Sequence, residues 1–116
     1  MKQKTITVSC VTLDSFFEGK QLAKPYMVKF DVQGYELMAI KGGSELLSGA
    51  ELCLVEVSVA PLYEGQATFS EIVIELERVG LLYSGNVSQQ FTPDGRIAYF
   101  DALFARNYPT RSQSID

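Results

Sequence analysis

The sequence contains no histidine, and only two of its 116 residues are cysteines. Without histidine the chain cannot build a Ser-His or Cys-His nucleophile pair or a His-ligated metal site. Cys10 and Cys53 lie inside apolar, strand-like stretches and lack the spacing of a metal site, so we expect both to be small, reduced core residues. Any acid–base chemistry therefore falls to carboxylates, lysine or tyrosine.

Positive charge and long apolar runs are also scarce. The chain has 10 Lys and Arg against 14 Asp and Glu, a net charge of −4, which argues against a nucleic acid partner. Its apolar runs, such as residues 52–55, are flanked by charge and fall well short of the roughly 20 residues of a membrane-spanning helix. The first residues lack the apolar stretch of a signal peptide. We expect no membrane association and a cytoplasmic location.

What the chain does have is the composition of one folded domain. Hydrophobic residues make up 47 %, with 7 Phe and 6 Tyr. The domain is expected over residues 1–107, and the polar residues 108–116, which include Pro109, are expected to form a loose tail.

Strand-like and helix-like patterns alternate along the chain. Strands are predicted over residues 5–11, 26–32, 52–58, 81–84 and 97–105. Helices are predicted over residues 12–17, 35–40, 44–47 and 69–79. This order is typical of an α/β fold with a mostly parallel sheet, helices on its faces and a final antiparallel strand.

Acidic side chains lie at the carboxyl ends of two of the predicted strands, at the sheet edge where α/β proteins bind ligands. Asp31, Gln33 and Gly34 end the second strand, and Glu36 opens the helix after it. Glu56 interrupts an otherwise apolar strand, which is costly unless the carboxylate is satisfied. Asp31, Glu36 and Glu56 would then line one pocket and position a hydroxyl, an amine or a hard cation such as Mg²⁺.

A purely structural interpretation of the same residues stays open. Asp31 would cap the turn, Glu36 would complement the helix dipole, and Glu56 would pair with a lysine. Lys29 is either an inward-facing base or a side chain that reaches the surface. The pair Gly42 and Gly43 indicates a helix break rather than a phosphate loop. Five aromatic residues are expected in the sheet core: Tyr26, Phe30, Tyr99, Phe100 and Phe104.

Several strings, in order, resemble the signature blocks of FkbM-type methyltransferases. They are TLDSF at 12–16, VKFDVQGYEL at 28–37, LVEV at 54–57, LYEGQ at 62–66 and DALFAR at 101–106. The resemblance implies a Rossmann-like class I methyltransferase that transfers a methyl group from S-adenosylmethionine, commonly to a hydroxyl of a natural product or sugar. It also implies catalytic roles for Asp31, Glu36 and Glu56, and cofactor contacts from Asp31, Gln33 and Gly34. Gln33 stands where many relatives have Glu.

The resemblance also implies that the chain is a carboxyl-terminal half-domain. The family's first strand and glycine-rich cofactor turn would precede residue 5, and the strands present would be the third to the seventh. Strand 26–32 would then lack its usual neighbour, and we expect it to pair with strand 5–11 or to join a homodimer through its exposed edge. An alternative of another class is a non-catalytic, self-associating α/β module that has lost cofactor binding.

Overall fold

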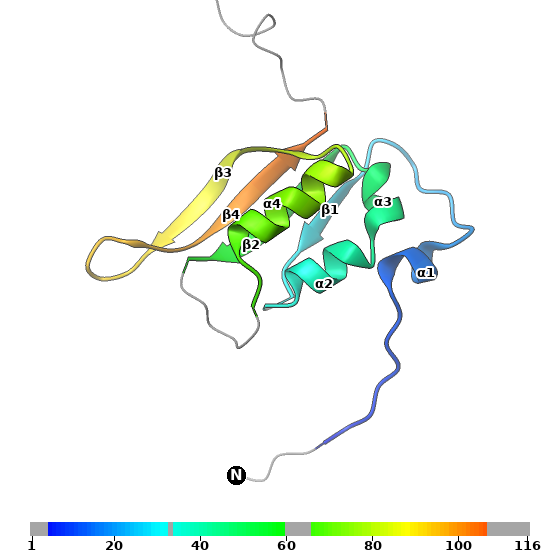
Figure 1. Cartoon of the computed structure of the whole chain (residues 1–116), viewed down its shortest axis with the longest axis horizontal. Helices are drawn as coiled ribbons and strands as arrows, with labels where there is room; N and C mark the ends of the chain where they lie inside the picture. Colours follow the sequence, from blue (N-terminus) through cyan, green and yellow to red (C-terminus); the bar gives the residue numbers. More distant parts are fainter. Residues whose placement is uncertain (1–4, 33, 60–65, 107–116) are drawn as a thin grey trace, which may run out of the picture.

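The computed structural model describes residues 5–32, 34–59 and 66–106, which form an α/β fold (Figure 1). The helices are α1 (Leu13–Phe17), α2 (Glu36–Lys41), α3 (Ser44–Ser48) and α4 (Phe69–Arg78). The strands are β1 (Met27–Phe30), β2 (Leu52–Ser58), β3 (Leu82–Phe91) and β4 (Ile97–Ala105). The α/β class predicted from the sequence is confirmed.

The four strands form one sheet in the order β1-β2-β4-β3. β1 pairs with β2 in parallel, whereas β4 is antiparallel to both β2 and β3. The prediction of a mostly parallel sheet is therefore wrong, although the last two strands do pair antiparallel as expected. The reason is the position of β4: the one reversed strand lies inside the sheet, so two of its three ladders are antiparallel.

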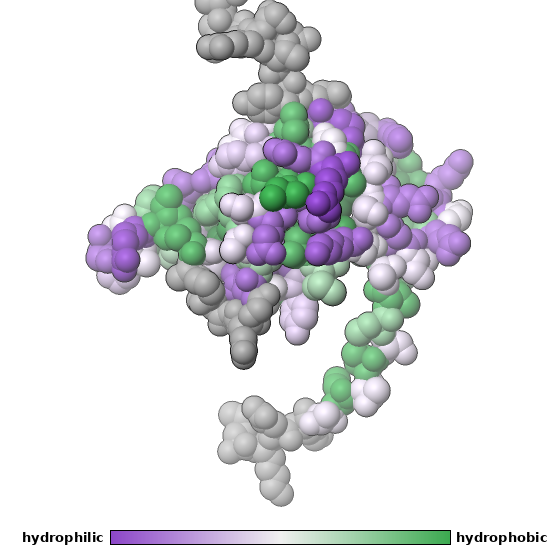
Figure 2. Space-filling view, in the orientation of Figure 1, coloured by the Kyte–Doolittle hydropathy of each residue, from purple (hydrophilic) through white to green (hydrophobic). Residues whose placement is uncertain are grey.

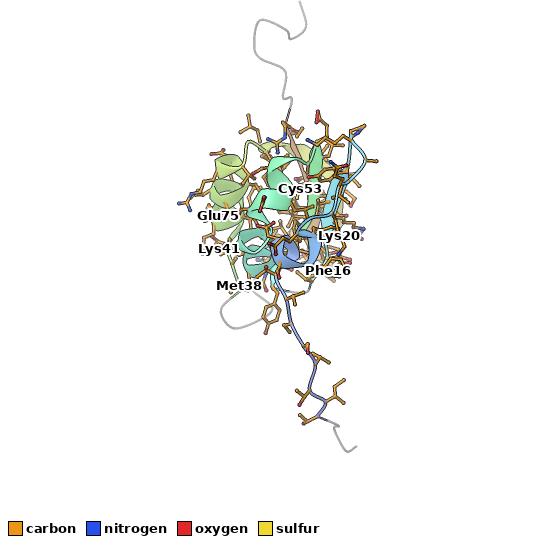
Figure 3. The ribbon with its side chains drawn as sticks, turned by 90° about the vertical axis from the view of Figure 1, so that its right-hand side faces the viewer. Phe16, Lys20, Met38, Lys41, Cys53 and Glu75 are labelled. Atoms are coloured by element: carbon orange, nitrogen blue, oxygen red, sulfur yellow. The ribbon has the colours of Figure 1, made fainter. Side chains whose placement is uncertain are left out.

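The core lies between the sheet and the helices α2, α3 and α4. In β2 burial alternates, with Cys53, Val55 and Val57 buried and the residues between them partly exposed. The buried positions pack with Ile72 and Leu76 of α4. Among the described residues these helices all lie on one face of the sheet (Figures 1 and 3). The other face carries the alternate residues of each strand, Glu56 among them.

Local sequence signals account for the helix boundaries. Thr12 caps α1, and Thr68 with Glu71 forms a capping box at the start of α4. Gly42 and Gly43 separate α2 from α3, as expected for a helix break. Asp14 ties α1 to α3, because its carboxylate accepts hydrogen bonds from the backbone N–H groups of Glu45 and Leu46, both at 2.9 Å.

The strand predicted over residues 5–11 is absent from the structure. This segment, called segment 5–11 below, is extended but belongs to no sheet, and Ile6, Val8 and Val11 are 77 %, 67 % and 68 % exposed. Figure 2 shows it as an apolar extension from the body of the molecule. Strand conformation requires a hydrogen-bonded neighbour as well as an alternating pattern, and here the neighbour is missing. Cys10 is consequently exposed, which corrects its prediction as a core residue, whereas Cys53 is buried as expected.

The predicted aromatic core is confirmed in part. Phe30 and Phe104 are buried, and Phe100 packs against the core. Tyr99 is 42 % exposed because its position in β4 points to the face without helices. Tyr26 is partly buried and donates a hydrogen bond to the Leu46 carbonyl.

Arg106, which follows β4 directly, links the ends of two helices and one turn through hydrogen bonds. Its guanidinium donates to the backbone carbonyls of Leu47 at 2.6 Å, Ala50 at 2.7 Å and Val79 at 2.7 Å. These carbonyls belong to the ends of α3 and α4 and to the turn before β2, so one side chain satisfies acceptors that helix ends leave without partners. These hydrogen bonds fix both helices against the sheet.

Candidate active site

The candidate site begins in the loop between β1 and α2, which Glu36 holds in shape. The Glu36 carboxylate accepts hydrogen bonds from the backbone N–H groups of Val32 and Gly34, both at 3.0 Å. Its side chain is only 7 % exposed. Glu36 therefore fixes the conformation of this loop through hydrogen bonds, in addition to complementing the helix dipole.

Gly34 allows this loop to turn. Its φ of 98° lies in the left-handed region, which L-residues rarely adopt. The turn brings the Gly34 N–H onto Glu36, and Tyr35 donates to the Val32 carbonyl at 3.3 Å. The backbone after β1 is thus folded tightly at the carboxyl end of the strand, which is where α/β proteins bind their ligands.

Glu56 supplies the second part of the site, on the neighbouring strand. It lies directly opposite Asp101 of β4. Burial raises the pKa of the Glu56 carboxyl above its ordinary 4.5, and the negative charges of Asp31, Asp101 and Glu36 raise it further, while Lys29 opposes them. Glu56 is therefore a stronger base than a solvated glutamate, in a region of negative potential.

The predicted residues are brought together in the following way. The negative charges of Asp31 and Glu36, near the carboxyl end of β1, both act on Glu56 of β2. Asp31 is exposed, at the start of the β1–α2 loop, and Gln33 lies outside the described residues. Lys29 is exposed on β1, which agrees with a surface-reaching side chain and not with an inward-facing base.

Sequence reasoning did not select Asp101. Its carboxylate accepts a hydrogen bond from the Ser88 hydroxyl at 2.6 Å, and it shares the sheet face of Glu56. The signal was available, because Asp101 is a lone carboxylate in an apolar strand, just as Glu56 is. Its pairing with Glu56 could not be seen without the register of β2 and β4.

A cavity opens at the carboxyl end of β2 on the helix-covered side of the sheet, and Asp31, Glu36 and Glu56 are not among the residues that line it. It measures about 310 Å³ and its wall is mainly apolar. The aromatic rings of Phe69 and Phe100 line it and meet edge to face, with their centroids 5.3 Å apart. Ser58 and Thr68 add hydroxyl groups. An apolar cavity with a few polar groups is the usual form of a small-molecule site.

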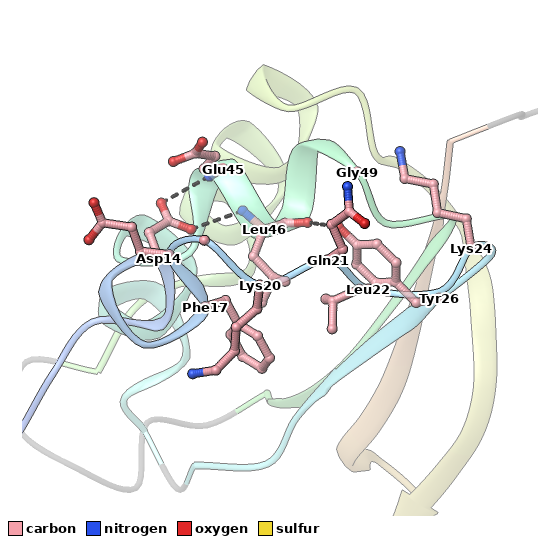
Figure 4. A pocket seen from close by; sticks show the side chains of 12 residues that line it. Asp14, Phe17, Lys20, Gln21, Leu22, Lys24, Tyr26, Glu45, Leu46 and Gly49 are labelled. Carbon is pink, nitrogen blue, oxygen red and sulfur yellow. Dashed lines mark hydrogen bonds between the residues drawn. The ribbon is translucent and has the colours of Figure 1, made fainter.

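A second, larger cavity of about 480 Å³ lies at the opposite end of β1 (Figure 4). Two of its polar side chains, Asp14 and Tyr26, are engaged in holding the fold. Asp14 caps α3, and the Tyr26 hydroxyl donates to the Leu46 carbonyl. Because this cavity is at the amino end of the strand, it is not part of the carboxylate site.

Within residues 5–32, 34–59 and 66–106, no three Asp, Glu or Cys side chains converge as metal ligands would. No helix in the same ranges is long and apolar enough to cross a bilayer.

The chain belongs to a family of methyltransferases. The profile of the FkbM methyltransferase domain matches residues 1–83, which include β1, β2, α4 and the carboxylates Asp31, Glu36 and Glu56. The resemblance seen in the sequence is thereby confirmed. The string at residues 101–106 lies beyond the matched region, and its assignment to the family stays a prediction.

Hexuronic acid methyltransferase AglP from Haloferax volcanii is similar to part of the chain. The two are 32 % identical over 53 residues, which is 46 % of this chain and 22 % of the relative. The chain thus aligns with less than a quarter of that relative's length. No solved structure matches the chain.

Proposed function

We propose that this chain contributes the acid–base part of the cleft of an S-adenosylmethionine-dependent O-methyltransferase. Its acceptor would be a hydroxyl on a small molecule or sugar. The observation that carries this function is the group of carboxylates at the carboxyl ends of β1 and β2, within the region that matches a methyltransferase family. Catalysis would rest mainly on alignment of the acceptor, with a carboxylate taking its proton.

Glu56 is our candidate proton acceptor. A general base works best when its pKa approaches the working pH, and the pKa of Glu56 is raised by burial and by Asp31, Asp101 and Glu36. The acceptor hydroxyl would donate its proton to a Glu56 carboxylate oxygen. Asp31, exposed at the start of the loop, would orient the acceptor or the cofactor.

The residues after β1 would hold the cofactor. Bound S-adenosylmethionine would supply a methyl group on a positively charged sulfonium, and the negative potential that raises the pKa of Glu56 suits a cation. Asp31, Gln33 and Gly34 are the proposed contacts. Glu36 was predicted to be catalytic; with its carboxylate bound to two backbone N–H groups, we propose that it acts by positioning this loop.

The acceptor class is proposed from the chemistry of the open sheet face that carries Glu56. On that face Tyr99, 42 % exposed, offers an aromatic surface for the apolar face of a ring, and Ser58, paired with it in the sheet, offers a hydroxyl. A sugar ring combines both requirements. The relative named as a hexuronic acid methyltransferase makes an acidic sugar a sensible first acceptor to test.

Several broader assignments belong to the same proposal. Residues 1–107 would be the carboxyl-terminal part of the methyltransferase fold, with residues 108–116 as a tail. The chain would form a homodimer through the open edge of β1, would not bind nucleic acid, given its net charge of −4, and would work in the cytoplasm.

Methyl transfer tests this function directly. Labelled S-adenosylmethionine would be incubated with the full chain and a panel of hexuronic acids and neutral sugars, and label in the sugar would be counted. We expect Glu56→Gln to lower the rate by about 10² or more, because it removes the base. The control Glu77→Gln, an exposed glutamate on α4, should stay within about twofold of wild type.

Two results would count against the assignment. Equal rates for wild type and Glu56→Gln would remove Glu56 as the proton acceptor. A well-folded chain that neither transfers methyl groups nor binds the cofactor product would favour the non-catalytic, self-associating module instead.

A further inference from the structure

β1 has one side without a partner. It lies at the edge of the sheet and pairs with β2 only, through Met27 to Phe30. In the part of the chain that the structure describes, no other strand lies beside it. An edge strand of this kind exposes a row of backbone N–H and C=O groups that can take up another strand.

Segment 5–11 has the complementary property. It is extended, carries no charged residue, and alternates apolar with polar side chains, yet it pairs with nothing in the described structure. Ile6 and Val8 are 77 % and 67 % exposed. Uncharged alternating segments are those that readily add to a sheet edge, since charge and proline are the usual means of blocking such pairing.

The fold directs segment 5–11 away from its own β1. α1 follows it directly, and α1 is fixed to the helix layer: the Asp14 carboxylate caps α3, and the Asp14 N–H donates to the Gly42 carbonyl at 2.8 Å. From this anchor the segment runs outward from the body of the molecule (Figure 1). Pairing within one chain would require α1 to leave these contacts.

We propose that two copies of the chain exchange this segment, each adding its residues 5–11 as a fifth strand beside β1 of the other. This inference rests on the proposed homodimer but not on methyl transfer. It assigns the dimer surface to two parts of each chain, the unpaired side of β1 and segment 5–11. The exchange would also bring the partner chain next to Asp31, which follows β1 directly.

The side-chain pattern fits this partner. On β1, Val28 and Phe30 face the helix-covered core while Met27 and Lys29 are exposed. An added strand would place Ile6, Val8 and Cys10 on one face and Thr5, Thr7, Ser9 and Val11 on the other, because side chains alternate along a strand. The apolar set would extend the core beside Phe30, and the second set, mainly hydroxyl residues, would continue the open face.

The test compares oligomeric state and amide exchange in the full chain. Sedimentation of the wild type over a concentration series should show a dimer, and the amides of residues 5–11 should be protected from hydrogen exchange. Val8→Asp should raise the dimer dissociation constant by at least about tenfold and remove the protection. Val8→Pro should do the same, because it deletes a backbone donor. Neither variant should impair folding, since Val8 is exposed within each copy.

Ile74→Asp is the matched control. Ile74 is also an exposed aliphatic residue, 52 % accessible on α4, and its replacement should leave the dimer intact. A dimer that both Val8 variants leave unchanged would overturn the exchange while sparing a homodimer through another surface. A wild type that stays monomeric at high concentration would overturn both, whether or not residues 5–11 are protected.

Discussion

Glu36 acts on the site through the backbone, and this predicts the effect of removing its charge. In Glu36→Gln, the new amide NH₂ would face one of the two backbone N–H groups that now donate to the carboxylate. Losing a hydrogen bond between a partly buried N–H group and a charged acceptor costs about 1.5–3 kcal/mol. We expect the free energy of unfolding in urea to fall by that amount.

Glu77→Gln serves as the comparison, because Glu77 is an exposed glutamate on α4. Its unfolding free energy should change by less than about 0.5 kcal/mol. If Glu36→Gln proves as stable as Glu77→Gln, the two hydrogen bonds from Val32 and Gly34 do not hold the loop.

Glu56 gives a pH dependence whose sign follows from its raised pKa. As the pH rises above 4.5, the unfolded chain loses the Glu56 proton before the folded chain does. Ionisation therefore favours the unfolded state, and the carboxyl lowers stability as the pH passes through its folded pKa. Melting temperatures of wild type and Glu56→Gln, measured from about pH 4 to about pH 7, should diverge in favour of the variant. A constant difference across this range would contradict the raised pKa.

Replacing Arg106 should lower the free energy of unfolding more than replacing an arginine that makes only an exposed ion pair. Arg106→Met removes three charge-assisted hydrogen bonds to the carbonyls of Leu47, Ala50 and Val79. We expect a loss of about 2–4 kcal/mol in chemical unfolding. Arg96→Met, which breaks an exposed ion pair with Asp94, should cost less than about 1 kcal/mol. Equal losses would show that these hydrogen bonds contribute nothing beyond a surface charge.

These residues mark the limit of prediction from sequence. Asp31 and Glu36 could be selected because they lie at the carboxyl end of a predicted strand, and Glu56 because it interrupts an apolar strand. The partners of Glu36 are backbone groups, which no side-chain pattern reveals. The Arg106 contacts join positions up to 59 residues apart, so only the fold brings them together.

At the scale of elements, α4 offers a local test of its own boundary. The Thr68 hydroxyl accepts a hydrogen bond from the Glu71 N–H at 3.2 Å, half of the capping box. Thr68→Ala should destabilise the chain by about 1 kcal/mol, measured as a shift in the thermal unfolding midpoint. Ser70→Ala lies one residue inside the helix and should change stability by less than about 0.5 kcal/mol. If Ser70→Ala destabilises the chain more than Thr68→Ala does, Thr68 is not the residue that caps α4.

Elements with a self-contained signal were predicted well from sequence. α4 and β2 occupy almost the predicted residues. The helical spacing of apolar residues in α4 and the apolar run in β2 are each visible in the local sequence. β3 continues to Phe91, well beyond the prediction, because its outer half is exposed and polar and takes strand form only by pairing with β4. For segment 5–11 the error is the reverse, because a strand was predicted and none formed. Its pattern suits a strand, but no described strand lies beside it.

At the scale of the whole molecule, the described chain has helices on one face of a four-stranded sheet and an open edge at β1. Apart from the absent strand 5–11, the sequence predicted the helices and strands in the right order. It could not predict that β4 enters between β2 and β3, since strand order depends on contacts between distant segments. That position matters for function, because it sets Asp101 opposite Glu56.

The most direct test is a calorimetric titration of S-adenosylhomocysteine into the folded full chain, with Asp31→Asn as the companion variant and Glu77→Gln as its control. We predict saturable binding that Asp31→Asn weakens by about tenfold and Glu77→Gln leaves unchanged. Absence of binding by a well-folded wild type, or equal affinity in Asp31→Asn, would contradict a cofactor site at the carboxyl end of β1.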